Sequence, residues 1–168
     1  IPSDKNIHFD PVEDGSTFLE NALIKARALY DIVQEPVIAD DSGLCVDALG
    51  GRPGIYSARY GSENGQKISD AERNALLLKE VGLKEPRSAR FVCAMVLLLS
   101  HDRFFIAQET LEGELIQEER GSGGFGYDPV LYLPEKGLCV AELDEDEKNR
   151  LSHRGKAGRR IAAILAAL

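Results

Sequence analysis

The sequence predicts an α/β fold, with helices on the flanks of a mixed β-sheet. Apolar residues recur at helical spacing in some segments, and other runs of strand length are rich in β-branched and aromatic residues. Turns rich in glycine and proline separate the two kinds of segment. The chain has 168 residues, of which 43% are hydrophobic, enough for one domain with a sizeable core. We therefore treat residues 1–168 as a single domain.

Two helices are predicted in the first half of the chain. Apolar residues recur at helical spacing over residues 17–34, and Glu20 stands at capping-box spacing from the first residue of that segment. A second helix is predicted over residues 70–81, where Ser69 and Glu72 have the spacing of another capping box. Both helices have a defined start in the sequence alone.

The strands are predicted between and after these helices. Residues 37–39 form a short buried strand that runs into a loop beginning at Asp40. Residues 91–99 and 103–111 flank a turn and are typical of a hairpin. Two more strands are predicted over residues 130–133 and 138–141. The remainder of the chain is predicted to be helical, with Asp144 and Glu147 capping the helix that ends the chain.

Charge and cysteine content narrow the function classes. The net charge of −8 argues against a nucleic-acid polymer as partner, because proteins that neutralise many backbone phosphates show a basic face. The three cysteines are widely spaced without a Cys-x-x-Cys pair, which favours neither a disulfide framework nor a zinc site. The longest apolar runs are shorter than the roughly 20 residues of a membrane span. We expect a cytoplasmic protein that does not enter the membrane.

Adjacent carboxylates mark the first candidate site. Asp40 and Asp41 at the end of a strand can hold a hard divalent cation through oxygen ligands while one of them orients a water molecule. Successive side chains of a strand point to opposite faces, so one of the two is expected to face a substrate. Glu13 is a second possible metal ligand. The alternatives are an Asx-turn that closes the strand and an exposed acid in a loop.

A glycine-rich segment forms the second candidate site. Gly121, Gly123 and Gly126 satisfy G-x-G-x-x-G, but a strand pattern follows them rather than the helix that a dinucleotide fingerprint requires. We interpret the glycines as positions where the backbone approaches a ligand, with Phe125 or Tyr127 offering a face on which a base stacks. The alternative is a flexible turn whose aromatic residues belong to the core.

A basic cluster near the C-terminus is the third candidate site. Lys148 and Arg154 suit phosphate or carbonyl oxygens, and His153 can donate to the edge of a purine. The alternative is a solvated helix face, which often carries such charges.

Taken together, these motifs strongly resemble the inosine triphosphate pyrophosphatase family. The resemblance extends from Glu13 nearly to the last residue, with four motifs in matching order and spacing. They read Ala39-Asp40-Asp41-Ser42-Gly43-Leu44, Leu49-Gly50-Gly51-Arg52-Pro53-Gly54-Ile55-Tyr56-Ser57-Ala58-Arg59-Tyr60, Gly123-Gly124-Phe125-Gly126-Tyr127-Asp128-Pro129 and Ser152-His153-Arg154.

The resemblance implies hydrolysis of ITP, dITP and XTP between the α- and β-phosphates, which removes deaminated purines from the nucleotide pool. It implies a long bent sheet, a nucleotide cleft between two lobes, a homodimer and Mg²⁺ as cofactor. Asp41 is expected to bind the metal and activate water, with Glu13 as the second ligand. The expected substrate contacts are Ser42, Arg59, Phe125, Gly126, Tyr127, Asp128, Lys148, His153 and Arg154.

The N-terminal stretch departs from the family pattern. The family opens with a strand and a phosphate-binding loop of Ser/Thr-x-Asn-x-x-Lys type, and residues 1–14 contain no such motif. We expect that a strand–loop–helix segment is missing. On this basis a nucleotide-binding regulatory module without catalysis stays open as a rival function. A second rival is a related pyrophosphatase that prefers modified pyrimidines.

Overall fold

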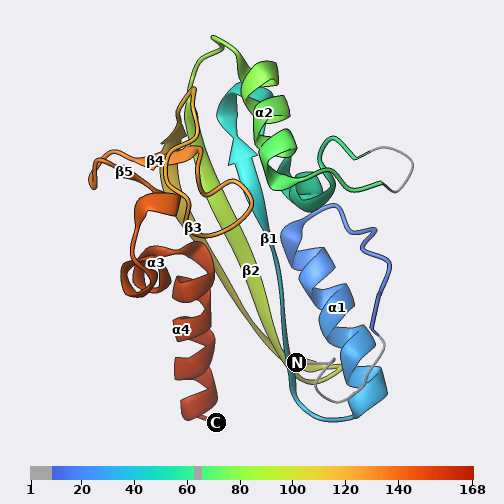
Figure 1. The fold of residues 1–168 in the computed structure, drawn as a ribbon. Helices are drawn as coiled ribbons and strands as arrows, with labels where there is room; N and C mark the ends of the chain where they lie inside the picture. Colours follow the sequence, from blue (N-terminus) through green and yellow to red (C-terminus); the bar gives the residue numbers. More distant parts are fainter. Residues whose placement is uncertain (1–8, 63–65) are drawn as a thin grey trace.

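The computed structural model describes residues 9–62 and 66–168 and confirms the α/β fold class (Figure 1). The strands lie in the order β1-β2-β3-β4-β5. Their bounds are Val37–Val46, Ser88–Ser100, Arg103–Leu115, Leu131–Leu133 and Leu138–Cys139. Every pairing between these strands is antiparallel, whereas the sequence analysis expected a mixed sheet. The four strands from β2 to β5 follow one another without a helix between them in the described residues, whereas parallel neighbours are usually joined by a crossover helix.

Strand β1 is longer than predicted, and the candidate acids lie inside it rather than in a loop after it. Asp40 pairs with Met95 and Asp41 pairs with Ala94 in the register of β1 and β2. Aspartate, serine and glycine are poor strand formers, so local propensity predicted a loop here. The long neighbouring strand β2 supplies hydrogen-bond partners along all ten residues of β1, which overrides that preference.

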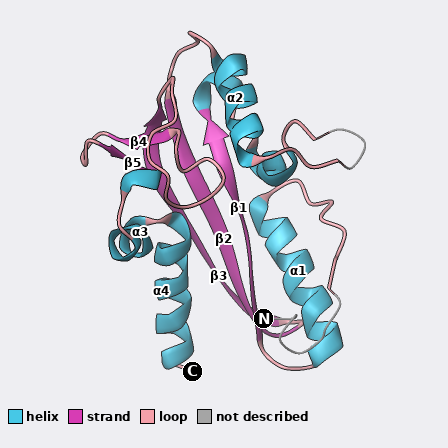
Figure 2. Ribbon diagram, viewed as in Figure 1, coloured by secondary structure: helices cyan, strands magenta, loops and turns pink. Residues whose placement is uncertain are grey.

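Strand β2 lies between β1 and β3 and is buried on both faces, because one helix covers each side of the sheet (Figure 2). Val96 and Leu98 pack with helix α1, whereas Met95 and Leu97 pack with helix α4. This alternation follows from the two-residue period of a strand. It explains why residues 91–98 read as a continuous apolar run in the sequence.

The helices α1 to α4 span Phe18–Val33, Asp70–Val81, Glu145–Leu151 and His153–Ala166. Thr17 caps α1 by accepting a hydrogen bond from the Glu20 amide, and the predicted capping box at the start of α2 is present. The C-terminal region is two helices rather than the single predicted one. Ser152 adopts an extended backbone conformation and caps α4 by accepting a hydrogen bond from Gly155 N. Because an N-cap residue is not helical, the chain bends there.

The two core clusters that pack α1 and α4 against β2 form the first lobe of the molecule. A third core cluster lies at the other end of the sheet and forms a second lobe. It joins α2 to the ends of β1, β2 and β3, to β4, and to the first and last of three short 3₁₀ helices with the loops around them. These 3₁₀ helices, η2 to η4, span Asp47–Leu49, Gly54–Arg59 and Val140–Glu142. Helices α1 and α4 cover the first lobe, and α2 covers the second (Figure 1). Within the described residues, no helix is long and apolar enough to cross a membrane.

Candidate functional site

A cavity of about 410 Å³ lies between the two lobes and collects most of the candidate residues. Its wall includes Ser42 from β1 and the cluster Lys148, His153 and Arg154 from α3 and α4. The segment 125–128, which follows the glycine run, forms another part of the wall. The structure therefore brings three groups of residues together around one cavity, although Ser42 and the segment 125–128 are more than 80 positions apart in the sequence.

Phe125 supplies an open aromatic face to this cavity. Phe125 is 65% exposed, and Lys148 Nζ lies 4.9 Å from the centre of its ring. Lys148 in turn forms an ion pair of 2.6 Å with Asp128, which is only 4% exposed. Asp128 also accepts a hydrogen bond of 2.9 Å from the Phe125 amide. One buried carboxylate thus orients both the aromatic ring and the cation beside it.

Tyr127 belongs to the core instead of offering its face to a ligand. It is 4% exposed, and its hydroxyl donates a hydrogen bond of 2.9 Å to the Ser57 carbonyl oxygen. Burial raises the pKa of the Tyr127 hydroxyl, which therefore stays protonated and keeps this contact. Of the two aromatic residues considered from the sequence, Phe125 has the exposed ring, whereas Tyr127 lines the cavity as a buried residue.

Glycine is required at position 124 for both conformation and space. Its φ of +77° lies in the left-handed region, and an added Cβ would lie 2.1 Å from Asp128 Oδ2. The same Cβ would lie 2.5 Å from Lys148 Nζ. A side chain at this position would separate the ion pair described above, because such distances are far shorter than any van der Waals contact.

His153 is an uncharged group in the cavity wall at neutral pH. Its ring stacks on Phe91 with the centroids 4.9 Å apart and the planes 16° from parallel. Burial lowers the pKa of His153 to about 4, and the neighbouring Arg154 guanidinium acts in the same direction. Its Nδ1 is buried and has no hydrogen-bond partner among the residues that the structure describes. A neutral imidazole carries one donor and one acceptor nitrogen, so this side chain can bind a polar ligand edge.

Arg154 connects the basic cluster to β1. Its Nε lies 3.0 Å from Asp40 Oδ2, and its second guanidinium nitrogen donates a hydrogen bond of 2.9 Å to Ser42 Oγ. Asp40 and Ser42 are two residues apart and therefore share one face of β1. The sequence analysis expected only one of the two adjacent acids to face the substrate, and Asp40 is the one on the cavity side, paired with an arginine.

Asp41 projects from the opposite face of β1, toward α1, and does not line the cavity. Its carboxylate accepts a hydrogen bond of 2.8 Å from Lys25 Nζ and one of 3.4 Å from Asn21 Nδ2. Lys25 Nζ also lies 3.3 Å from Glu13 Oε2. The two predicted metal ligands thus converge on one cationic group. Three or more acidic, histidine or cysteine side chains do not gather into a metal-type cluster anywhere in residues 9–62 and 66–168.

Among the nine expected substrate contacts, Arg59 is the one that does not line the cavity. Its guanidinium lies 4.9 Å from the ring centre of Tyr56, in a separate hollow beside η3. A cation over an aromatic face is a common structural contact, so this placement has a local explanation.

Several polar residues around the site were missed by the sequence analysis. Asn21 and Lys25 stand four residues apart on α1, and Asn21 is 1% exposed within the apolar stripe of that helix. A buried asparagine at a helical core position is a signal that could have indicated them. Arg73 and Asn74 of α2 are also buried, and Arg73 lines the cavity. Arg73 bonds locally, to Asp70 in α2 and to the Ile68 carbonyl oxygen. The partners of Asn74 are Glu119 and Gly126, in a loop that no sequence pattern connects to α2.

Comparisons with known proteins show which family the chain is similar to. Residues 2–164 match the Ham1 family. A dITP/XTP pyrophosphatase of Treponema denticola is 56% identical over 94% of this chain and 81% of its own length. A dITP/XTP pyrophosphatase of Treponema pallidum is 48% identical over 99% of this chain, which spans 61% of that relative.

Solved structures of related proteins have the same fold. A HAM1 protein from Coxiella burnetii superposes with a TM-score of 0.91 at 39% sequence identity, covering 99% of this chain and 84% of its own. The Staphylococcus aureus Ham1 protein gives a TM-score of 0.88 at 41% identity, covering 95% of this chain and 81% of its own. The resemblance that the motifs indicated is thereby confirmed, and the chain belongs to the Ham1 family.

Proposed function

We propose that this protein hydrolyses deaminated purine nucleoside triphosphates, namely ITP, dITP and XTP, to the nucleoside monophosphate and pyrophosphate. The observation that carries the proposal is the shared cavity, whose wall includes the open ring of Phe125 and the side chain of Ser42, while Asp41 projects from the other face of the same strand. The names of the curated relatives support the same class of substrate. The protein would thus be a hydrolase that removes non-canonical purines from the nucleotide pool.

The base end of the cavity accounts for the choice of purine. The purine stacks on Phe125, and Lys148, His153 and Arg154 are hydrogen-bond donors that surround this position. A 6-oxo oxygen satisfies such donors, whereas the 6-amino group of adenine leaves them unpaired. Each buried donor left unpaired costs about 1–3 kcal/mol, so two or three of them suffice to exclude ATP by orders of magnitude.

The phosphate end lies at the free edge of β1. The cavity wall includes Ser42 together with its neighbour Gly43 and with Ala58 of η3, so the cavity reaches the edge of the described sheet. A triphosphate that leaves the cavity there passes around β1 to its other face. On that face it meets Lys25 and the carboxylate of Asp41, which the structure already holds together at 2.8 Å.

Glu13 and Asp41 are the residues that would hold Mg²⁺. Their carboxylates both form ion pairs with the ammonium group of Lys25, an arrangement that supports a cation site at this point. Mg²⁺ is usually bound by one or two carboxylates together with substrate phosphates and water, so two acids are an adequate protein contribution. When bound, the ion neutralises charge on the polyphosphate and polarises the phosphorus centre that is attacked.

Asp41 is the group that would take the proton from the attacking water. Asn21 and Lys25 each bind one of its oxygens, which fixes the orientation of the carboxylate. Water adds to the α-phosphorus, the bond between that phosphorus and the bridging oxygen breaks, and pyrophosphate leaves with the electron pair. Proton removal by a positioned carboxylate contributes about 10²–10⁴-fold to such a rate.

The test combines substrate selectivity with one substitution. The protein with Mg²⁺ is expected to convert ITP and XTP to monophosphate and pyrophosphate, and ATP much more slowly. Asp41→Asn is expected to lower kcat by at least about 100-fold. It should leave the affinity for IMP within about twofold, because Asp41 lies outside the base cavity. Release of orthophosphate, or equal rates on ATP and ITP, would contradict the proposal.

The homodimer and the cytoplasmic location belong to the same proposal. Sedimentation analysis of the purified protein tests the first, and fractionation of the producing cells tests the second. A monomer at micromolar concentration would overturn the dimer without affecting the proposed reaction.

A further inference from the structure

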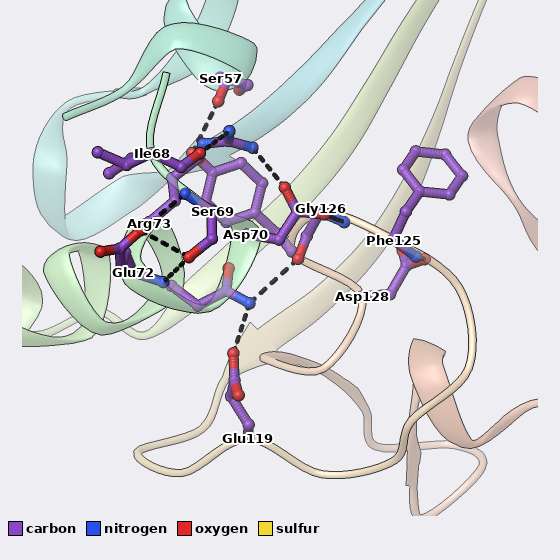
Figure 3. Close-up of polar contacts among 12 residues, drawn as sticks. Ser57, Ile68, Ser69, Asp70, Glu72, Arg73, Glu119, Phe125, Gly126 and Asp128 are labelled. Atoms are coloured by element: carbon purple, nitrogen blue, oxygen red, sulfur yellow. Dashed lines mark hydrogen bonds and ion pairs between the residues drawn. The ribbon is translucent and has the colours of Figure 1, made fainter. Parts of the chain in front are cut away.

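The wall that carries Phe125 is held in place by side chains from the first turns of α2 (Figure 3). Gly126 N donates a hydrogen bond of 2.7 Å to Asp70 Oδ2, and Asn74 Nδ2 donates one of 3.0 Å to the Gly126 carbonyl oxygen. Both polar groups of the Gly126 backbone are therefore bound by one helix. The peptide group that joins Phe125 to Gly126 has its orientation fixed by the first of these contacts.

The two side chains of α2 are themselves oriented before they meet the loop. Asp70 and Asn74 stand four residues apart, so they share one face of the helix. Arg73 donates to Asp70 Oδ1 at 2.9 Å and leaves Oδ2 for Gly126. Asn74, which is 1% exposed, also donates a hydrogen bond of 2.6 Å to Glu119 Oε1.

Packing alone does not hold this segment. Phe125 is 65% exposed, so its ring gains little from burial. Behind the segment lies a second hollow of about 190 Å³, lined by residues of α2 and by the segment 122–126. The segment is thus a thin wall between two spaces, and Gly126, at a φ of +62°, adds little stiffness of its own. Hydrogen bonds across the smaller hollow are what keep the wall from moving into it.

We propose that Asp70 and Asn74 are positioning residues that clamp the base-binding wall and thereby set the affinity of the site for purines. Neither side chain lines the larger cavity, so neither touches the base directly. The identity of the ligand rests on the proposed function, whereas the clamp itself rests only on the contacts above. The clamp also links α2 in one lobe to the ring on which the substrate stacks.

Three substitutions test the clamp. Asp70→Ala removes the acceptor for the Gly126 amide, and Asn74→Ala removes the donor to its carbonyl oxygen. Asn74→Asp keeps the size of the side chain but replaces the donor by a carboxylate that faces the Glu119 carboxylate. Asp70→Asn preserves an acceptor oxygen and is the conservative rescue. The matched control is Glu72→Ala, which weakens the start of α2 by removing its capping box but has no contact with the wall.

Two measurements are made on each variant. Hydrogen exchange followed by mass spectrometry reports on residues 121–128, and calorimetry gives the Kd for IMP. Loss of one hydrogen bond of this kind corresponds to about a tenfold change in an equilibrium constant. Asp70→Ala and Asn74→Ala are each expected to weaken IMP binding about tenfold and to speed exchange in the segment. Asn74→Asp is expected to be at least as damaging, Asp70→Asn to recover part of the affinity, and Glu72→Ala to resemble the wild type.

The outcomes separate the two proposals. Unchanged exchange in both alanine variants overturns the clamp, and so does an equal loss of IMP affinity in Glu72→Ala, since helix fraying would then explain it. A wild-type protein that does not bind IMP overturns the proposed function. In that case the exchange data alone decide the clamp, because they need no ligand.

Discussion

The buried imidazole of His153 makes the stability of the protein depend on pH in a way that one substitution can isolate. Burial, followed by the Arg154 charge, lowers the pKa of His153 from 6.5 to about 4. Because the folded-state pKa lies below the unfolded value, the unfolded chain binds more protons between these pH values. The stabilising contribution is therefore complete above pH 6.5 and is lost as the pH falls toward 4. Linkage gives a loss of about 2 kcal/mol at pH 5 and about 3 kcal/mol at pH 4.

The assay is urea unfolding of the wild type and of His153→Gln at pH 7, 6, 5 and 4. The many carboxylates of the chain titrate in both proteins, so the difference between the two free energies of unfolding isolates the imidazole. That difference is expected to shift by about 3 kcal/mol from pH 7 to pH 4, with the wild type losing more. Parallel curves for the two proteins, or a steeper loss in the variant, would refute the reasoning.

Two further predictions concern the walls of the cavity. Gly43→Ala is expected to destabilise the protein by about 1–3 kcal/mol, because the new Cβ would lie 2.5 Å from the Gly54 carbonyl oxygen. The matched control Gly158→Ala, where nothing lies within 4 Å, should instead stabilise α4 by about 1 kcal/mol in the same thermal unfolding assay. Lys148→Met leaves the Asp128 carboxylate buried without its cation and should cost about 3 kcal/mol in urea unfolding. It should also weaken IMP binding, and an unaltered Kd would contradict the role given to Lys148.

Local signals were reliable where the chain itself supplies the partner. The start of α2 followed from Ser69 and Glu72, since a capping box is formed by residues three positions apart. The hairpin of β2 and β3 followed from two long apolar runs around a short turn. The motifs also identified residues of the cavity wall, because the family that they resemble shares one fold, in which these motifs lie together. Ser42, Phe125 and His153 do line one space.

Predictions failed where distant partners decide the conformation. Strand β1 continues through Asp41 because β2 pairs with it, although the local residues favour a loop. The division of the C-terminal helix was missed for a local reason, because the Ser152 side chain accepts a hydrogen bond from the Gly155 amide and starts a new helix. The sequence analysis did not place Arg59 over Tyr56, because it predicted no helix over residues 54–59, where a 3₁₀ helix sets residues three positions apart on one side.

The sequence by itself determined the class of fold, the family and the set of residues from which a site could be built. Composition, helical periodicity and short motifs are properties of neighbouring residues and can be read without coordinates. The tertiary structure decided which side chains face one another across the sheet and between the lobes. Asp40 meets Arg154 on the cavity side, Asp41 meets Lys25 on the other, and α2 reaches across to Gly126. These relations depend on strand register and on the packing of two lobes, both of which arise from contacts between residues far apart in the chain.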